Sequence, residues 1–527
     1  DWRLTAQGYI GRGGTLSVEK TKSGETALVL STGETIPATA GENGTLTAAL
    51  TLSLEKAAEN TTLDPNLEAE WADFRGTSYT YDADSGTVAA GGSRYTNNGV
   101  TSAPIPVESL NTELSWATKL GDGYSSGAVG CPILVDGDLV TYSGKSIYRV
   151  DTVSGEVLAK GTMAETTSFG INNATYYGGM IFVGLAGGRI QAFDAKTLES
   201  LWLFQDDLGG QPNCPITVYD GYLYTGFWLA EDRDAHFVCL SITDEDPAQS
   251  LEQKLPTWTV TRRGGFYWAG AYVNDDFVLV GTDDGQSGCI DSTGAPNRSS
   301  ALLMLDPRTG ALLDSREGLP GDIRSAVSYD SSTDAYYFAT KGGYFYKATL
   351  SDTGVLSDLQ SFNMGFMATA TPIVYKGVGY VSCSGKGTSQ FDAGSVIAVD
   401  VATMTQLDRV DTYGYVQASM LLTTAYEETG KLYIYAPNNL TPGNIQVVTY
   451  DIASKKMEIE DLYVPTGAAR QYCLCPIVCG ADGTLYVKND SGYMFALSRE
   501  PGVNGWKISF DANGGSIQGA SSLVTDK

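Results

Sequence analysis

The sequence predicts an all-β fold made of repeated four-stranded sheets, and three observations support this prediction. A small residue, Pro, a β-branched run and a Gly turn occur in this order four times, starting at Cys131, Cys214, Thr371 and Cys475. A short apolar strand that ends in Asp and a turn recurs at intervals of roughly 43 to 62 residues. The chain has 62 Gly for turns, and 42% of its 527 residues are hydrophobic. Four short strands fill each interval, which is the period of a β-propeller blade.

The first hairpin of each repeat follows from local chemistry. Pro is suited to the first residue of a strand, where the sheet requires no N–H. An Asp-Gly or Lys-Gly pair then closes the hairpin, as at 136–137 and 376–377. The Asp that ends the third strand, as at Asp151 and Asp306, can accept hydrogen bonds from backbone N–H groups two residues on. These Asp residues are therefore predicted to form turns and not to act as catalytic acids.

The fourth, outermost strands are marked by Trp116, Trp202, Trp258 and Trp506, whose rings are expected to pack between neighbouring blades. The repeats add up to eight blades. Seven is the alternative, because the repeats between residues 214 and 320 are long and irregular. Closing the ring requires one blade with strands from both ends of the chain. The Trp116 strand can complete the last blade beside residues 475–498, and the Trp506 strand is the competing choice.

Composition and charge exclude several classes of function. With 61 acidic against 34 basic residues the net charge is −27, so no nucleic-acid partner is expected. His236 is the only histidine, which excludes His-rich zinc or copper sites, and we expect it to be a surface residue. No stretch approaches the roughly 20 apolar residues of a transmembrane helix. The acidic, Gly-, Ser-, Thr- and Tyr-rich composition favours an extracellular or cell-surface location.

The eight cysteines favour buried, free thiols over a disulfide framework, because a chain of this length does not need covalent staples. Cys473, Cys475 and Cys479 fall within a structural repeat, so no metal site is predicted there.

The repeats resemble the pyrroloquinoline-quinone (PQQ)-like β-propeller, the superfamily of quinoprotein alcohol dehydrogenases and of outer-membrane assembly propellers. The resemblance covers roughly residues 71–508. The lead-in at 71–76 and 97–104 resembles the entry segment of propellers in surface proteins of Gram-positive gut bacteria. Residues 509–516, Ser-Phe-Asp-Ala-Asn-Gly-Gly-Ser, resemble the start of the Listeria–Bacteroides repeat of bacterial surface proteins.

Three domains are expected from these patterns. Residues 1–70 form a small N-terminal β domain, residues 71–508 form the PQQ-like propeller, and residues 509–527 form the start of a Listeria–Bacteroides-type repeat or a disordered tail.

The sequence departs from the enzymes of this superfamily. They carry a vicinal Cys-Cys disulfide and a calcium site of Glu, Asn and a catalytic Asp, whereas no two cysteines are adjacent here and no such constellation is recognisable. We therefore expect neither PQQ nor enzymatic activity. Calcium remains possible at Asp275-Asp276 and Asp283-Asp284, which lie in one hairpin region.

The mouth of the central channel is the expected ligand site, and the residues just before each inner strand line it. Rings, amides and arginines there suit a sugar or a carboxylate. The alternative is that these side chains fill the channel with water and each other. The candidate residues are Tyr124, Asn172, Asn173, Gln211, Asn213, Tyr267, Trp268, Arg324, Tyr415, Gln417, Arg470 and Tyr472.

The predicted function is that of a non-enzymatic binding or scaffold propeller in an adhesion-type surface protein. Its partner would be an extracellular protein, peptide or glycan. One alternative is a carbohydrate-active or quinone-type enzyme that uses the channel mouth. The other alternative is a structural spacer without a ligand.

Overall fold

The computed structural model describes residues 99–123, 127–167, 170–171, 174–287, 290–385 and 393–499, together with eleven short strands outside these ranges. The chain divides into two compact units. One unit combines residues 1–63 with residues 499–527, and the other contains residues 64–498. Among the described residues, no helix has the length and apolar composition needed to cross a membrane.

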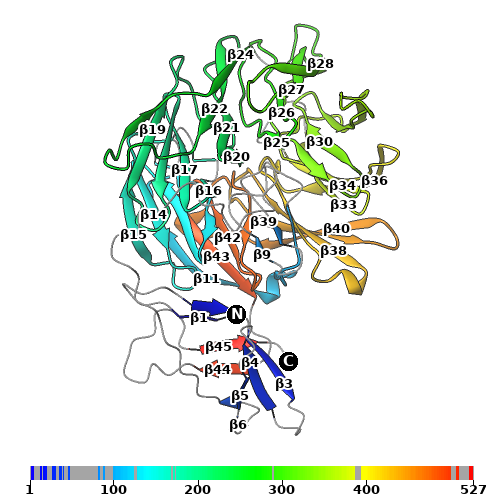
Figure 1. The fold of residues 1–527 in the computed structure, drawn as a ribbon. Coiled ribbons are helices and arrows are strands. Elements are labelled where there is room, and N and C mark those ends of the chain that lie inside the picture. The colour runs from blue at the N-terminus through cyan, green and yellow to red at the C-terminus, as the bar shows by residue number, and fades with distance from the viewer. Residues whose placement is uncertain are drawn as a thin grey trace. The chain divides into compact units, whose positions relative to one another are not determined.

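The larger unit is an eight-bladed β-propeller, so the predictions of an all-β fold and of eight blades are confirmed (Figure 1). Each blade is an antiparallel sheet, and we number the blades by the position of their inner strands along the chain. Blade 1 contains β12 (Ile133–Val135), β13 (Asp138–Ser143), β14 (Ser146–Val150) and β15 (Val157–Thr162); blade 2 contains β16 (Thr175–Tyr177), β17 (Met180–Leu185), β18 (Arg189–Asp194) and β19 (Ser200–Gln205); blade 3 contains β20 (Thr217–Tyr219), β21 (Tyr222–Gly226), β22 (Asp234–Ser241) and β24 (Trp258–Arg263); blade 4 contains β25 (Tyr272–Val273), β26 (Val278–Gly281), β27 (Arg298–Leu305) and β28 (Leu312–Pro320).

The second half of the ring repeats this arrangement. Blade 5 contains β29 (Ser328–Asp330), β30 (Ala335–Ala339), β31 (Tyr344–Ala348) and β32 (Gln360–Asn363); blade 6 contains β33 (Ile373–Tyr375), β34 (Val378–Ser384), β35 (Gly394–Asp400) and β36 (Thr405–Thr412); blade 7 contains β37 (Leu421–Thr423), β38 (Lys431–Pro437), β39 (Ile445–Asp451) and β40 (Lys456–Tyr463); blade 8 contains β41 (Val478–Cys479), β42 (Leu485–Lys488), β43 (Tyr493–Arg499) and β11 (Thr112–Lys119). Three 3-10 turns, η2 (Ser109–Asn111), η3 (Glu427–Thr429) and η4 (Gly467–Ala469), lie in loops.

Two extra strands explain the irregular repeats. β23 (Glu252–Lys254) leaves blade 3 and pairs in parallel with β19 of blade 2, which lengthens the third repeat. β10 (Val100–Thr101) pairs in parallel with β37 of blade 7. The stretch from 214 to 320 therefore contains two complete blades, and the seven-blade alternative is wrong.

The short hairpins form as the turn chemistry predicts. Asp136 and Gly137 have φ angles of 49° and 81°, and Lys376 and Gly377 have φ angles of 47° and 78°. Positive φ at both central residues defines the type I′ turn, whose twist matches that of the flanking strands. The strands β12 and β13 therefore pair directly up to Val135 opposite Asp138.

The ring is closed by strands from both ends of the unit. β11, which carries Trp116, lies next to β43 in blade 8, so the first of the two predicted closures is confirmed (Figure 1). The competing choice is wrong, because Trp506 lies in β44 (Trp506–Ser509), which pairs with β45 (Ser522–Thr525) in the smaller unit.

The outer-strand tryptophans join neighbouring blades through their indole N–H groups. Nε1 of Trp116 donates to the carbonyl of Thr152 at 3.0 Å. Nε1 of Trp202 donates to Ile242 at 3.1 Å, and Nε1 of Trp258 donates to Pro307 at 3.0 Å. Each acceptor lies in the turn after the third strand of the next blade, so each indole fixes one blade against the next.

The acidic residues of these turns are turn-formers, as predicted. Oδ1 of Asp151 accepts the backbone N–H groups of Val153 and Ser154 at 3.0 and 2.7 Å. Oδ1 of Asp306 accepts those of Arg308 and Thr309 at 2.9 and 2.8 Å.

The smaller unit also consists of strands. Its described elements are β1 (Trp2–Leu4), β2 (Arg12–Gly14), β3 (Leu16–Lys20), β4 (Thr26–Leu30), β5 (Thr35–Pro37), β6 (Thr39–Ala40), β7 (Leu46–Thr47), β44 and β45; β8 (Tyr81–Asp82) and β9 (Thr87–Val88) belong to the larger unit. Most of residues 48–98 and 510–527 lie outside the described residues, so the predicted domain boundaries at 70 and 508 stay predictions.

Seven of the eight cysteines are described, and all seven are buried and outside any disulfide, as predicted. Cys289 lies outside the described residues.

Replacing Gly155 by Ala tests the blade junction. Gly155 has a φ of 72°, and a Cβ there would lie 2.6 Å from the Trp116 ring. Gly354 is a matched control, because it has a φ of 76° in the corresponding turn of blade 5 and no atom within 4 Å of its Cβ position. Both variants share the cost of Ala at positive φ, about 1 kcal/mol. We expect Gly155→Ala to lose a further 1–3 kcal/mol or so through overpacking, measured by urea unfolding. Equal losses in the two variants would contradict the role of the Trp116 junction.

Candidate functional site

One face of the ring collects the candidate side chains. Because strands alternate in direction, the loops after each second strand and those entering each first strand lie at the same end of the blades. We call this end the mouth face. It includes the loop 264–271 before β25, the loop 321–327 before β29, and the loop 227–233 between β21 and β22.

Five of the predicted residues come together on the mouth face. Nδ2 of Asn213 donates to Gln211 Oε1 at 3.1 Å and contacts the Tyr267 hydroxyl at 3.3 Å. The Tyr267 hydroxyl donates to Gln211 Oε1 at 3.2 Å. The guanidinium of Arg324 lies 4.6 Å from the centre of the Tyr267 ring, and Trp268 packs against the same ring. These polar groups largely satisfy one another.

An apolar cluster extends across this face. Ile171 of blade 2, Tyr267 and Trp268 of blade 4 form its buried part, and Trp228 of blade 3 and Leu474 of blade 8 pack against it. The rings of Trp228 and Tyr267 stack with centroids 4.7 Å apart. Side chains from four blades therefore meet at the mouth, as the plugged-channel alternative predicts.

The other described residues of the prediction lie in loops of the same face but outside this group. Tyr415 and Gln417 are buried between blades 6 and 7, where the Tyr415 hydroxyl is 3.0 Å from Thr369 Oγ1 and Asn439 Nδ2 donates to Gln417 Oε1 at 2.7 Å. In the loop that leads to β41, Arg470 is exposed and Tyr472 is partly exposed. Tyr124, Asn172 and Asn173 lie outside the described residues.

Sequence reasoning missed the charged partners of Arg324. Its Nη2 lies 3.0 Å from Glu231 Oε1, 2.7 Å from Asp283 Oδ2 and 3.2 Å from Asp322 Oδ2. Lys341 Nζ binds the same oxygen of Asp322 at 2.8 Å. The side chains of Asp283 and Asp322 are 0% and 1% exposed. The predicted mouth residues include no carboxylate, and in the sequence only the Asp322-x-Arg324 spacing hints at the group.

The two innermost carboxylates of this group differ, because burial raises the pKa of Asp283 well above its ordinary value despite the charge of Arg324. Burial alone would raise the pKa of Asp322, but the charges of Arg324 and Lys341 outweigh it and lower that pKa. Asp284, whose N–H donates to Asp322 Oδ1, is also buried but has no cation among the described ion pairs. Burial, followed by the charge of Asp322, raises the pKa of Asp284 to about 6.

Two groups of described side chains have the separation that a metal ion requires. One consists of Glu231, Asp283 and Asp322, and the other of Asp206, Asp207 and His236. In the first group the Nη2 of Arg324 lies among all three carboxylates, in the place that a cation would take. Asp275-Asp276 and Asp283-Asp284 lie at opposite ends of β26, so the two pairs cannot form a single calcium site.

His236 is not a surface residue, contrary to expectation. It lies in β22 with its side chain 13% exposed, and its Nδ1 is 2.8 Å from Oδ1 of the buried Asp206. The sequence could not show this contact, because Asp206 belongs to the preceding blade.

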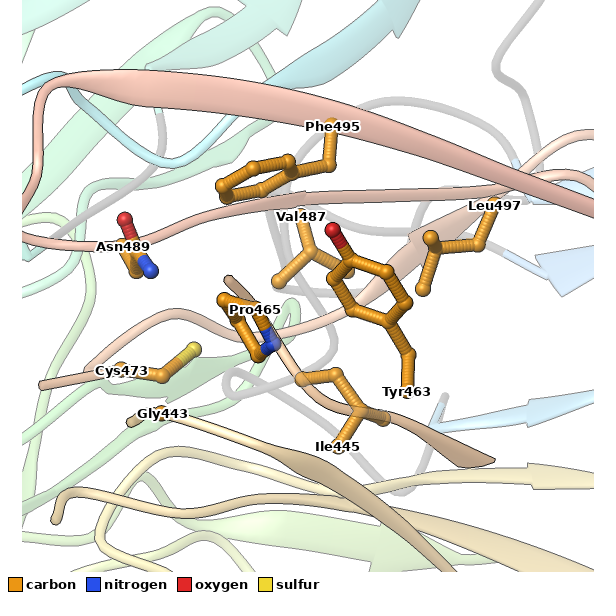
Figure 2. A pocket seen from close by; sticks show the side chains of 9 residues that line it. All are labelled: Gly443, Ile445, Tyr463, Pro465, Cys473, Val487, Asn489, Phe495 and Leu497. Atoms are coloured by element: carbon orange, nitrogen blue, oxygen red, sulfur yellow. The ribbon is translucent and has the colours of Figure 1, made fainter. Parts of the chain in front are cut away.

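A small cleft opens between blades 7 and 8, lined mainly by apolar side chains such as Ile445, Val487, Phe495 and Leu497 (Figure 2). Its volume of about 10 Å³ accommodates roughly one water molecule. It is therefore too small for a ligand.

The described residues of the mouth face do not fit PQQ with calcium. A planar cofactor needs an open slot, whereas side chains from four blades pack together on this face in the apolar cluster. The carboxylates that could hold a calcium ion are already neutralised by Arg324 and Lys341.

Comparison with known proteins confirms the PQQ-type propeller fold. No family model matches the chain. The quinohemoprotein alcohol dehydrogenase ADH IIB of Pseudomonas putida is 25% identical over 285 residues, which span 45% of this chain and 41% of that enzyme. The structure of the Comamonas testosteroni quinohemoprotein alcohol dehydrogenase has a TM-score of 0.50 at 15% identity, covering 78% of this chain and 80% of that one. ADHIIG of Pseudomonas putida HK5 has a TM-score of 0.50 at 13% identity, covering 77% and 78%. The likeness concerns the fold, and the chain spans less than half of its curated relative.

Asp284 gives a pH test of the buried group. Its pKa of about 6 exceeds the value of about 3.9 in an unfolded chain, so the folded state holds an extra proton between these values. The free energy of unfolding should therefore fall as the pH rises from about 4 to about 6. Asp284→Asn is uncharged, so it should lack this decline and be more stable than the wild type at pH 7.

Urea unfolding between pH 4 and 7.5 measures this difference, with Asp276→Asn as the control at the exposed end of β26. Parallel pH profiles for the wild type and Asp284→Asn would show that Asp284 titrates normally.

Proposed function

We propose that the chain is a non-enzymatic extracellular propeller of an adhesion-type bacterial surface protein, and that it binds its partner on the mouth face. In this proposal residues 71–508 are the binding domain. Residues 1–70 and 509–527 are flanking modules, the latter the start of a Listeria–Bacteroides-type repeat. The location and the bacterial setting rest on the sequence resemblance.

The proposal rests on one observation, which is that the inner carboxylates of the mouth are buried and paired with Arg324. General acid–base catalysis needs a carboxyl group that can exchange protons with a substrate. Asp283 and Asp322 are buried and held by Arg324, which suits counter-ions better than catalytic groups. The buried thiols offer no nucleophile either, since burial raises the pKa of Cys239 and of Cys473 to about 12.

The rim of the mouth offers groups for recognition. Around the buried apolar cluster Arg470 is exposed, and Gln211, Trp228 and Tyr472 are partly exposed. Aromatic faces stack on sugars and apolar side chains, amides bind hydroxyl or peptide groups, and Arg pairs with carboxylates. We infer that the partner is a glycan or a peptide. The positive φ of Trp268, 64°, adds support, because such strain in a bulky residue is concentrated at functional sites.

A ligand panel tests this proposal. Thermal unfolding is followed with glycans, extended peptides, calcium, and PQQ with calcium. We expect a glycan or peptide to raise the melting temperature, because a ligand that binds only the folded state adds about 2.7 kcal/mol at 100 times its Kd. Trp228→Ala should abolish the shift. Tyr222→Ala, an exposed aromatic in the β20–β21 turn at the opposite end of blade 3, should retain it.

Two results would overturn the proposal. A shift with PQQ and calcium would favour a quinone-type enzyme, and no shift with any ligand would favour a spacer.

A further inference from the structure

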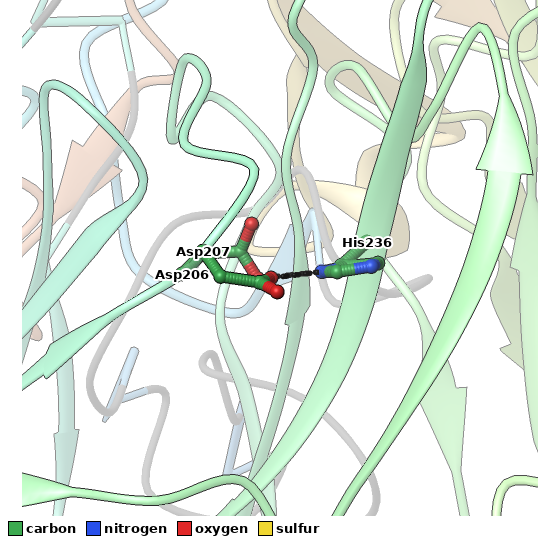
Figure 3. A group of neighbouring side chains, drawn as sticks. All are labelled: Asp206, Asp207 and His236. Carbon is green, nitrogen blue, oxygen red and sulfur yellow. Dashed lines mark hydrogen bonds and ion pairs between the residues drawn. The ribbon is translucent and has the colours of Figure 1, made fainter.

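The second metal-compatible group joins two blades. Asp206 and Asp207 directly follow β19 of blade 2, and His236 lies in β22 of blade 3 (Figure 3). Nδ1 of His236 is 2.8 Å from Oδ1 of Asp206 and 3.3 Å from Oδ1 of Asp207. One imidazole nitrogen and two carboxylate oxygens therefore lie within 4.8 Å of one another.

The charges of this group are not balanced by Lys or Arg. Within the part of the chain that the structure describes, the ion-pair contacts of Asp206 and Asp207 are with His236 alone. The Asp206 side chain is only 2% exposed, so solvent screens it poorly. The contrast with the Arg324 group is informative. There a guanidinium occupies the centre of three carboxylates, whereas here the only cationic candidate is an imidazole whose nitrogen is itself a metal ligand.

The two distances from His236 Nδ1 match the spacing of ligands in a coordination shell. Metal–ligand bonds of about 2.0–2.2 Å place two ligands of one ion roughly 2.9–3.5 Å apart. The two distances from Nδ1 lie at this spacing, so an ion could enter with only small side-chain movements. In the structure, Nδ1 of His236 forms a hydrogen bond with Oδ1 of Asp206.

We propose that Asp206, Asp207 and His236 bind a divalent transition-metal ion of the zinc type. Calcium takes oxygen ligands, whereas an imidazole with carboxylates suits zinc and its first-row neighbours. Asp207 is 86% exposed, which leaves an open side where water completes the coordination. The proposal does not depend on the function proposed above.

The bound ion would fasten the rim of the mouth. The other oxygen of Asp206, Oδ2, accepts the N–H of Leu208 at 3.1 Å, which orients the carboxylate. The same loop continues to Gln211 and Asn213 on the mouth face. An ion that joins Asp206 to His236 therefore ties this loop to the third blade and stabilises the folded state.

The single histidine makes a direct test possible. Protein labelled with ¹³C and ¹⁵N only in histidine gives one imidazole signal, that of His236. On titration with ZnCl₂ this signal should shift and saturate at one equivalent, MnCl₂ should broaden it, and EDTA should reverse both effects. CaCl₂ should leave it unchanged.

Variants identify the ligands. Asp207 lies on the surface, so the Asp207→Asn variant should fold normally. It should weaken zinc affinity by about tenfold or more, because even the loss of a group that only supports a metal ligand has an effect of about this size. Asp206→Asn should weaken it further. Asp232→Asn, an exposed aspartate of the neighbouring loop, is the matched control and should bind as the wild type does.

Three outcomes would overturn the proposal. They are an unchanged signal at millimolar zinc, a zinc response that is identical in Asp207→Asn and the wild type, and a calcium response as strong as that to zinc.

Discussion

The bond from an outer strand to a turn of the next blade is the interaction on which the ring depends. A blade is a small sheet, and its faces are buried only when its neighbours stack against it. At three junctions an indole N–H makes this bond. Between blades 4 and 5 the guanidinium of Arg316 makes the equivalent bond, because its Nε donates to the carbonyl of Ser357 at 3.2 Å. The donor differs, but each of these four junctions pairs an outer-strand donor with a turn carbonyl.

Closure of the ring also determines what can happen at its mouth. The loops before the inner strands are forced together, and their polar groups must find partners or remain unsatisfied. Arg324 is the partner of Glu231, Asp283 and Asp322. The apolar cluster around Tyr267 and Trp268 packs on the same face. The mouth is therefore packed at its centre, and the proposed recognition would use the exposed and partly exposed side chains on its rim.

The sequence predicted the features that depend on neighbours along the chain. The turns at 136–137 and at Asp151 follow from residues two or three positions apart. The Trp116 strand was one of two candidates for the closing strand, because it precedes the first repeat. The mouth was predicted less well. Five candidate residues do meet there, but Glu231 and Asp283 reach Arg324 from separate loops, and His236 contacts Asp206 of another blade. Contacts between blades depend on the register and twist of whole sheets, which no local pattern records.

The central claim is that the mouth carboxylates are counter-ions of Arg324. A double-mutant cycle of Arg324→Met and Asp283→Asn, measured as free energies of unfolding, tests it most directly. Removing Arg324 alone should cost about 3–5 kcal/mol, because it leaves buried carboxylates unpaired. The loss of unfolding free energy in the double variant should be smaller than the sum of the two single losses by at least about 2 kcal/mol. Losses that add to within about 0.5 kcal/mol would contradict the claim, because they would mean that Asp283 is held in place independently of Arg324.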